Sequence, residues 1–410
     1  MHEVAITGIG IVSCLGTGVR KVTESLRLGR SGVRVDAKRK ELGFRGVLTG
    51  CISDFTPPPL DRKLRRTTTD FGLQAYGAAL QAIEMAGWSD GDVRSPATGL
   101  ILGNDTSTAA NARQIETVKQ EQSTFSLGAS QVFQSLNSTV TMNLNAILGN
   151  LGACWTVSGA CASGGHAVGQ AADLIACGRQ DRMLCGGVQE INWESVASFD
   201  ATNAFSVREE SPEEASRPFD AARDGLVPSG GAAVVALERA DSARARGVVV
   251  LGHVLSYSFS ADGRDLAVPT GEGLRRCMED CLGRGGVRAD DVDYVCAHGT
   301  STPLGDAAEA RAIASVFGRP GPWVSSVKSM TGHEMWMAGA AQVVYTAIMG
   351  QARFIAPNIN FTRQEDEAAK VRIAAETIDR APRHTLCNSA GFGGTNSCIL
   401  IRMDSAGNEL

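Results

Sequence analysis

A chain of 410 residues can bury a large core, and its length predicts two or three domains or one large duplicated one. Its formal net charge of −5 and sequence pI near 5.8 give no global attraction to nucleic acid or to an anionic membrane. No apolar run approaches the roughly 18 residues of a membrane span, and the start, MHEVAITGIG, lacks the features of a secretory signal. We therefore expect a soluble cytoplasmic enzyme that binds neither nucleic acid nor membrane.

The eleven cysteines form no CxxC pair, and most of them lie inside apolar segments. An odd, scattered set of this kind indicates buried free thiols in a reducing cytoplasm rather than a disulfide framework.

Strand-like apolar runs alternate with helical patterns along the whole chain. The predicted strands are Glu3–Thr7, Gly99–Leu102, Cys154–Val157, Arg182–Cys185, Ala232–Leu237, Val248–Leu255, Val292–Ala297, Trp323–Ser326, Leu386–Ser389 and Ser397–Ile401. The predicted helices are Asp70–Met85, Ser130–Ile147, His166–Cys177, Gly273–Leu282, Leu304–Phe317 and Ala338–Gly350. This alternation predicts an α/β protein with helices packed against sheets. The polar stretches 103–128, 202–230 and 360–369 are expected to be surface or active-site loops.

The two halves of the chain show a weak similarity of pattern. Cys161 opens a helix in the first half, and His333 precedes the helix Ala338–Gly350 in the second. Each follows a strand and a turn of small residues. We therefore predict a duplicated fold with halves at 1–250 and 251–410.

Cys161 lies in VSGACASGG (157–165), between a predicted strand and a predicted helix. A thiol at such a turn meets the free N–H groups and the positive dipole end of the helix, which stabilise a thiolate. The small neighbours leave room for a substrate. Taken alone, this stretch favours a packing thiol over a nucleophile, since free cysteines are among the most buried residues.

His298 lies in DYVCAHGTSTPLGD (293–306), at the carboxyl end of a predicted strand, where α/β proteins place their sites. Thr300 and Thr302 offer hydroxyls, and Asp306 and Glu309 share one face of the following helix. The alternative is a helix-capping loop followed by a solvated acidic face.

A second histidine, His333, follows Lys328 by five residues in SSVKSMTGHEMWMAGA (325–340). Lysine is a compact charge that can tune a neighbour's pKa. Lys328 could pair with Asp306 or Glu309 and favour neutral His333, or it could be an ordinary surface lysine.

The turn NSAGFGGTNS (388–397) carries three glycines around Phe392, which would let a backbone N–H point at a developing oxyanion. It does not fit a nucleotide-binding GxGxxG motif. One nucleophile, two histidines, a lysine and an oxyanion turn together suit acyl transfer through a covalent thioester.

With these motifs in order, the chain resembles the β-ketoacyl-acyl carrier protein synthases, decarboxylating condensing enzymes of the thiolase superfamily. The resemblance runs from VAITGIGIVSCLG (4–16) through ACASG, RPFDAARDGLV (217–227), HGTSTPLGD and KSMTGH to GFGGTNSCILI (391–401). QEINWESVASFDATNAFS (189–206) is most similar to synthase I. The resemblance implies a thiolase fold, with duplicated βαβαβαββ halves in a five-layered α-β-α-β-α sandwich.

The resemblance also implies roles for these residues. Cys161 would accept the acyl chain from an acyl carrier protein, with the N–H groups of Cys161 and Phe392 as oxyanion hole and Phe392 as gate. His298 and His333 would assist decarboxylation of malonyl-carrier protein. Lys328 and Glu309 would be the pair that holds His333, with Asp306 beside them in a supporting role. Thr300 and Thr302 would bind the phosphopantetheine arm.

The enzyme itself is expected to bind no cofactor and no metal, since the phosphopantetheine arm belongs to the carrier. The basic patch Lys63, Arg65 and Arg66 would dock the acidic acyl carrier protein, or would simply be a solvated face. The enzyme is expected to be a dimer, either with itself or with a chain-length-factor subunit. The presence of Cys161 argues that this chain is the catalytic subunit.

Two segments depart from the family pattern. Met335, Trp336 and Met337 replace the small residues that usually follow the second histidine, and would line the acyl tunnel or a subunit interface, or simply fill the core. The loop 103–114 has Asp105 and threonines in place of a glycine-rich sequence.

These departures favour the ketosynthase of a type II polyketide synthase, one that makes polyenes for example. The alternative is a homodimeric, fatty-acid-elongating synthase I/II. A non-catalytic scaffold is disfavoured by the intact set of reactive residues.

Overall fold

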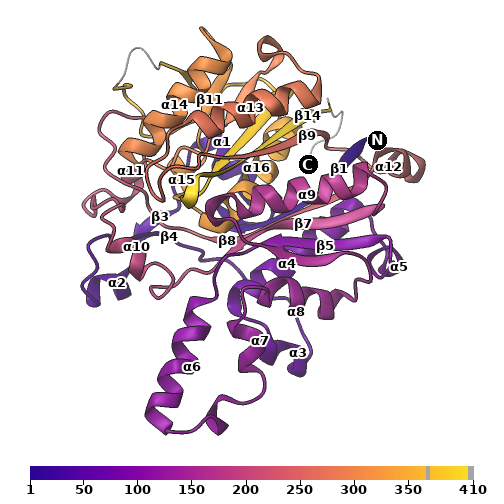
Figure 1. Ribbon diagram of the computed structural model, residues 1–410, viewed down its shortest axis with the longest axis vertical. Helices are drawn as coiled ribbons and strands as arrows, with labels where there is room; N and C mark the ends of the chain where they lie inside the picture. Colours follow the sequence, from indigo (N-terminus) through magenta and orange to yellow (C-terminus); the bar gives the residue numbers. More distant parts are fainter. Residues whose placement is uncertain (366–369, 405–410) are drawn as a thin grey trace.

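The computed structural model describes residues 1–365 and 370–404, and its strands form two arrays with the same internal order (Figure 1). The first array runs β6-β5-β7-β8-β1 and the second β11-β10-β13-β14-β9, with β12 at its edge. Counted along its own half of the chain, and without β12 and the short peripheral strands, each array has its third, second, fourth, fifth and first strands side by side in that order. This repeated order confirms the predicted duplication. A short antiparallel pairing of β1 with β9 joins the arrays into one continuous sheet. The strands of the first array are β1 (Val4–Ser13), β5 (Thr98–Gly103), β6 (Cys154–Val157), β7 (Arg182–Gln189) and β8 (Gly231–Arg239); those of the second are β9 (Gly252–Ala261), β10 (Tyr294–Cys296), β11 (Trp323–Ser325), β12 (Arg372–Ile373), β13 (His384–Ala390) and β14 (Thr395–Met403).

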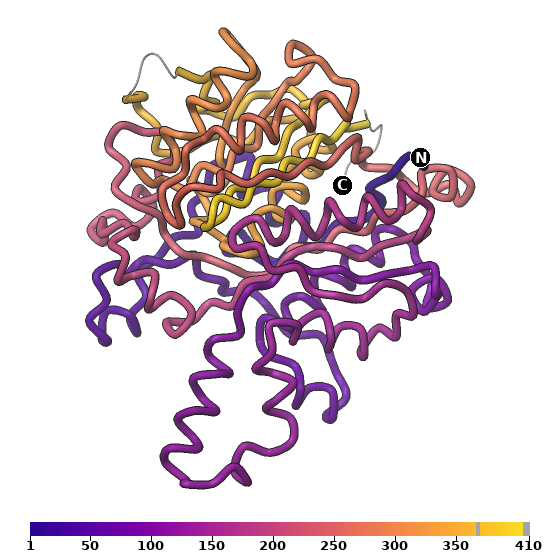
Figure 2. Tube along the Cα trace, viewed as in Figure 1, coloured from indigo at the N-terminus to yellow at the C-terminus, as the bar shows by residue number. Residues whose placement is uncertain are grey.

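Helices form the other three layers of the sandwich (Figures 1 and 2). Two of them, α9 (Ser163–Ala176) and α16 (Ala338–Ala352), pack against each other between the arrays. The outer face of the first array is covered by α4 (Asp70–Ala86) and α8 (Thr139–Leu148), and that of the second by α13 (Glu272–Gly285) and α14 (Pro303–Phe317). The expected five-layered thiolase fold is therefore confirmed.

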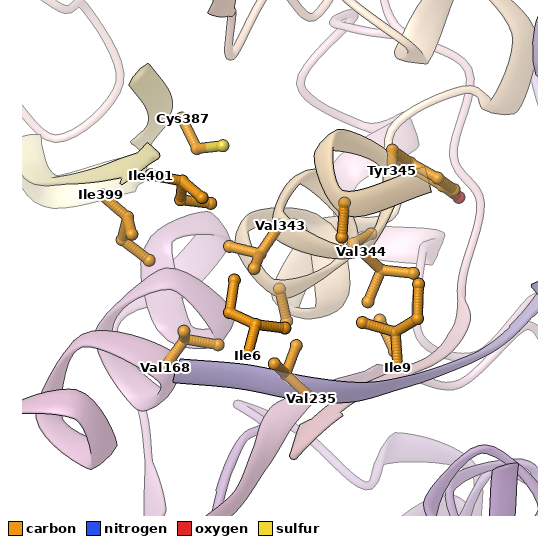
Figure 3. Close-up of a cluster of buried hydrophobic side chains, with 14 of the residues drawn as sticks. Ile6, Ile9, Val168, Val235, Val343, Val344, Tyr345, Cys387, Ile399 and Ile401 are labelled. Atoms are coloured by element: carbon orange, nitrogen blue, oxygen red, sulfur yellow. The ribbon is translucent and has the colours of Figure 1, made fainter. Parts of the chain in front are cut away.

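The strands β1, β5, β7 and β8 are buried on both faces, so their sequences are rich in apolar and small residues. In β8, Ala233, Val235 and Leu237 face the central core, whereas Ala232, Val234 and Ala236 face the outer helices. Figure 3 shows the central core, where side chains of β1, β8 and β14 enclose those of α16.

The two central helices approach closely because small residues meet where they begin. A Cβ on Gly339 would lie 2.4 Å from the Gly165 backbone nitrogen, and one on Gly164 would lie 2.9 Å from the Ala340 nitrogen. These distances are shorter than van der Waals contact. The close approach places the beginnings of α9 and α16, and therefore the segments that precede them, side by side.

All ten predicted strands are confirmed, nine of them with shifted ends, but two other predictions were wrong. The expected helix Ser130–Ile147 is broken at Leu136, whose backbone is extended, into α7 (Gln131–Ser135) and α8. The expected loop 103–128 contains α6 (Thr108–Glu121), which has no apolar stripe because only Ala110 is buried. In Figure 1, α6 and α7 extend away from the body of the molecule.

The remaining elements are short or peripheral. They are β2 (Gly16–Thr17), α1 (Val19–Leu28), β3 (Val33–Val35), α2 (Ala37–Glu41), β4 (Leu48–Gly50), α3 (Arg62–Thr67), α5 (Asp90–Val93), α10 (Ala197–Asp200), α11 (Pro212–Ala215), α12 (Ala240–Arg246), α15 (Lys328–Thr331) and the 3-10 turns η1 (Phe125–Leu127), η2 (Ala160–Ala162), η3 (Ala289–Asp291), η4 (Met335–Met337) and η5 (Phe392–Gly394). The expected loop 202–230 holds only α11, and the expected loop 360–369 extends beyond the described residues at 366–369.

All eleven cysteines are free thiols, as expected. The expected burial holds for Cys161, Cys185, Cys277, Cys281, Cys296, Cys387 and Cys398, whereas Cys51, Cys154 and Cys177 are exposed and Cys14 is intermediate. Within residues 1–365 and 370–404, no helix has the length and apolar character needed to cross a membrane. The division of the chain into two units at residue 250 stays a prediction. The last strand of the first array along the chain is β8, and the first strand of the second array is β9.

Candidate active site

Cys161 lies in the tight turn that joins β6 to α9. Ala160, just before it, has a φ of +47°, in the left-handed region that a non-glycine residue rarely adopts. Such strain is typical of functional turns. Cys161 is only 6% exposed, so the turn holds its thiol inside the molecule, at the start of the central helix.

His333 meets this thiol from the second half of the chain. Its Nε2 lies 3.2 Å from the Cys161 Sγ, while its Nδ1 accepts a hydrogen bond of 3.2 Å from the Met335 backbone N–H. Because Nδ1 accepts, the proton of a neutral ring is on Nε2, which faces the sulfur. The fold therefore brings together two of the residues that the sequence proposed, across 172 positions of the chain.

Burial raises the pKa of the Cys161 thiol to about 12, with Asp105 raising it and Lys328 lowering it. The expectation from the sequence was that the start of a helix would favour the thiolate. In the folded protein desolvation outweighs that effect, and the resting thiol is protonated.

His298 completes a pair of imidazoles. Its ring lies edge-on to that of His333, with centroids 5.2 Å apart. Burial and the nearby Lys328 hold the pKa of both histidines well below the usual range, so both are neutral. The buried Nδ1 of His298 has no hydrogen-bond partner among the residues that the structure describes, and an unpaired buried nitrogen suits a substrate or water.

Lys328 and Glu309 hold the backbone around His298. The Lys328 Nζ donates a hydrogen bond of 2.6 Å to the His298 carbonyl oxygen. The Glu309 carboxylate accepts hydrogen bonds from the N–H groups of His298 at 2.8 Å and Gly299 at 2.7 Å. Burial lowers the pKa of Lys328 and raises that of Glu309. Their direct contacts are thus with the His298 segment, whereas the sequence suggested that they would hold His333.

Asp306 also binds backbone. It accepts hydrogen bonds from the N–H groups of Thr300 and Phe219, both at 2.8 Å, and burial raises its pKa to about 7. The hydroxyl oxygens of Thr300 and Thr302 lie 2.9 Å apart. Asp306 therefore shapes the loop that presents the two threonines.

The glycine-rich turn at Phe392 packs on the nucleophile turn. A Cβ on Gly391 would lie 3.0 Å from the Gly159 carbonyl oxygen, closer than most real Cβ contacts, so glycine favours this approach. The Phe392 ring is 44% exposed and stacks on Phe199, with centroids 5.8 Å apart. The turn that carries Phe392 therefore lies against the turn that carries Cys161, and Phe392 itself is partly open to solvent.

Two residues near His333 were missed by sequence reasoning. Glu334, the next residue, is buried, and burial raises its pKa to about 7. Tyr345 donates a hydrogen bond of 2.6 Å to its carboxylate. The sequence did contain a signal for Glu334, because it is a charged residue between His333 and an apolar run, where a carboxyl group needs a buried partner.

The basic patch lies apart from these residues. Lys63, Arg65 and Arg66 are exposed on α3, which lies beside α7 and far from α15 in Figure 1. The Arg65 guanidinium forms an ion pair of 3.1 Å with Asp70.

No group of three His, Cys, Asp or Glu side chains in the described part of the chain is placed to hold a metal ion. The arrangement offers instead a buried thiol with two neutral imidazoles, which suits thioester chemistry.

Two family models match the chain: the β-ketoacyl synthase N-terminal domain over residues 1–243 and the β-ketoacyl synthase C-terminal domain over residues 251–362. The chain is 38% identical over 405 residues to the 3-oxoacyl-[acyl-carrier-protein] synthase 1 of Haemophilus influenzae, covering 98% of this chain and 99% of that protein. It is 36% identical to the synthase 1 of Escherichia coli K12 with the same coverage.

Solved structures of similar fold include a β-ketoacyl synthase from Burkholderia phymatum, with a TM-score of 0.93 and 31% identity over 98% of this chain and 100% of that one. The ishigamide ketosynthase/chain length factor has a TM-score of 0.90 and 28% identity, over 98% of this chain and 99% of that one. A ketosynthase in complex with its type II polyketide acyl carrier protein has a TM-score of 0.89 and 26% identity, over 98% of this chain and 100% of that one.

Proposed function

Because the chain belongs to the β-ketoacyl synthase family of acyl-transferring condensing enzymes, we propose that Cys161, His298 and His333 carry out its condensation. The family reaction joins an acyl thioester to malonyl-acyl carrier protein and gives a β-ketoacyl-carrier protein. The observation that carries the assignment is the contact of 3.2 Å between the His333 Nε2 and the Cys161 Sγ, with His298 beside it.

In the first half-reaction, the Cys161 sulfur attacks the carbonyl carbon of the acyl-carrier thioester. The bond to the pantetheine sulfur breaks, and the thiol proton of Cys161 ends on the released pantetheine. The His333 Nε2–H donates to the Cys161 sulfur and stabilises its charge as the proton leaves. The N–H groups of Cys161 and Phe392 receive the oxyanion of the tetrahedral intermediate.

In the second half-reaction, the malonyl unit loses CO2, and the electron pair of the broken C–C bond forms an enolate. Neutral His298 and His333 donate hydrogen bonds to the enolate oxygen, which suits their lowered pKa values. The enolate carbon then attacks the acyl carbonyl, the bond to Cys161 breaks, and the resulting thiolate takes up a proton.

The other predicted residues position these groups. Lys328 and Glu309 hold the His298 backbone, Asp306 shapes its loop, and Thr300 and Thr302 bind the phosphopantetheine arm of the carrier. The enzyme needs no cofactor of its own. Exposed Lys63, Arg65 and Arg66 on α3 receive the acidic carrier protein.

For the pathway, we propose the catalytic ketosynthase of a type II polyketide synthase, paired with a chain-length-factor subunit. Asp105 and Trp336 beside the acyl site support this assignment, since a saturated growing chain prefers a smooth apolar wall. The end-to-end identity of 38% with a synthase 1 favours the alternative, a homodimeric synthase of fatty-acid elongation. The eleven free cysteines support the expected cytoplasmic location.

The two pathways differ in the partner that activity requires. The purified chain alone should be a poor catalyst of chain extension and should gain activity with a co-expressed subunit that lacks the cysteine. A fully active homodimer would favour the fatty-acid alternative.

Acylation of Cys161 tests the site directly. After incubation with butyryl-acyl carrier protein, peptide mass mapping should find the butyryl group on Cys161. The adduct should persist in Cys51→Ser, which removes an exposed thiol, and disappear in Cys161→Ala. A folded enzyme with no adduct, or with adducts only on exposed cysteines, would contradict the assignment.

A further inference from the structure

Two of the three bulky residues after His333 lie next to the nucleophile. Met335 and Trp336 share one buried apolar cluster with Cys161, whereas Met337 packs in the central core between the sheets. Trp336 is only 5% exposed. The apolar surroundings of the thiol therefore include an indole ring.

A hydrogen bond fixes this indole in place. The Trp336 Nε1–H donates to the Thr106 hydroxyl oxygen at 3.2 Å, and that hydroxyl donates in turn to the Glu190 carboxylate at 3.4 Å. Glu190 is buried and also accepts a hydrogen bond from the Thr108 backbone N–H. Turning the indole away would leave its buried N–H without this hydrogen-bond partner, which is unfavourable.

The other aromatic rings of the site have no such polar anchor. Phe199 lies between Trp336 and Phe392, with centroid distances of 6.1 and 5.8 Å. The three rings form a row that begins at exposed Phe392 and ends at buried Trp336. Phenylalanine rings can turn to admit a substrate, whereas the hydrogen-bonded indole is a fixed end wall.

The groups behind and beside this wall are polar. Beyond the indole lie Thr106 and the Glu190 carboxylate. Half-buried Asp105 accepts a hydrogen bond from the Ala160 N–H, next to the nucleophile, and its pKa is raised by burial. A long alkyl chain that displaced Trp336 would therefore meet buried oxygens rather than apolar surface.

We infer that Trp336 is the residue that determines acyl specificity and limits the saturated acyl group that Cys161 accepts to short chains. This inference rests on the proposed condensation at Cys161 and concerns the acyl unit with which extension begins. The reaction that supplies the enzyme's substrate must load short acyl units onto the carrier protein.

Acylation rates measured over a series of chain lengths test the inference. The wild-type enzyme is mixed with acetyl-, butyryl-, octanoyl- or lauroyl-acyl carrier protein, and the mass gained by the intact protein is followed in time. Acetyl and butyryl groups should load at least about tenfold faster than lauroyl. Trp336→Leu opens space at the wall and should remove most of this difference.

Trp88→Leu is the matched control, because Trp88 is also buried and its indole N–H donates to a carboxylate, that of Glu238, at 3.4 Å. It should keep the wild-type preference. Wild-type enzyme that loads lauroyl as fast as acetyl would overturn the inference and leave the proposed function intact, even if Trp336→Leu fails to fold. A short-chain preference that persists in folded Trp336→Leu would remove Trp336 as its cause. Loading of no acyl group at all would instead overturn the proposed function.

Discussion

At the scale of single residues, His333 is held in one orientation by two contacts. The Met335 N–H binds its Nδ1, and its Nε2–H faces the Cys161 sulfur, so the ring can donate to a substrate oxygen only from Nε2. Met335 has a φ of +46°, in the left-handed region, which indicates that the fold maintains strain to place this N–H.

His333→Ala should separate the two half-reactions. The variant keeps Cys161 and should still be acylated, although more slowly because the sulfur loses a hydrogen-bond donor. It also loses a donor to the enolate, so release of CO2 from malonyl-carrier protein should fall much further, by about 10²-fold or more. Rates of acyl loading and of CO2 release give the two readouts. His2→Ala, which removes an exposed imidazole, should change neither. Normal condensation by His333→Ala would remove this role.

Glu334 should make stability depend on pH. Burial raises its pKa from the ordinary 4.5 to about 7, so between these values the folded state binds more protons than the unfolded state. The free energy of unfolding should therefore fall as pH rises through this window, and level off above it. Asp306, whose pKa is also raised to about 7, adds to the same slope.

Urea unfolding of Glu334→Gln across this pH range checks the contribution. The glutamine stays neutral, so the variant should show a shallower decline than the wild type. Glu121→Gln, a change at an exposed position, should keep the wild-type slope. An unchanged slope in Glu334→Gln would show that Glu334 titrates normally.

At the scale of elements, the site depends on how closely α9 and α16 approach. The turns before these helices carry Cys161 and His333, and the contact of 3.2 Å between the two side chains requires the helices to stay together. Gly165 and Gly339 allow that approach.

Gly339→Ala should therefore cost both stability and activity. Its Cβ would lie 2.4 Å from the Gly165 nitrogen, and overpacking of this kind costs about 1–3 kcal/mol. Denaturant unfolding measures the loss. In Gly283→Ala, within α13, the new methyl group meets no atom within 4 Å, and that variant should be as stable as the wild type or slightly more stable. Equal stabilities of the two variants would mean that the helices can separate freely.

Sequence patterns predicted the strands and central helices because each carries buried apolar residues at a regular spacing. The helix α6 was missed because only Ala110 is buried in it, which leaves no periodic signal. Cys161, His298 and His333 were found through their glycine-rich turns. The contacts of Glu309 and Lys328 with the His298 backbone were not found, because the spacing of residues in a sequence does not show which backbone groups a side chain will bind.

Long-range packing explains the other differences. The indole of Trp336 is fixed by Thr106, 230 positions away in the chain, so the segment between β5 and α6 and the segment after His333 form one wall. The protonation state of the Cys161 thiol could not be predicted from the sequence either. A helix start favours the thiolate, but the degree of burial that outweighs it exists only in the folded protein.

At the scale of the whole molecule, the enzyme must recognise a second protein. The net charge of −5 gives no general attraction to an acidic carrier, and we propose that the local basic groups on α3 provide it. Exposed charges act mainly on the association rate, and their effect is screened by salt.

The double variant Lys63→Glu/Arg66→Glu should raise the KM for acyl carrier protein by about tenfold at low salt and leave kcat little changed. Steady-state kinetics at two salt concentrations measure this, and the defect should shrink at high salt. A double charge reversal elsewhere, Arg288→Glu/Lys38→Glu, changes the net charge equally and should have little effect, since both side chains are exposed on other elements. Equal defects in the two double variants would place carrier docking away from α3.

The most direct test of the central claim is a single-turnover condensation followed by mass spectrometry. Enzyme carrying butyryl on Cys161, prepared together with the co-expressed subunit that lacks the cysteine, is mixed with malonyl-acyl carrier protein, and the proteins are weighed as the reaction proceeds. Cys161 should lose its butyryl group as the carrier becomes 3-oxohexanoyl-carrier protein, with CO2 released in equal amount. A butyryl group that remains on Cys161 beside intact malonyl-carrier protein, or CO2 release without the longer product, would contradict the account.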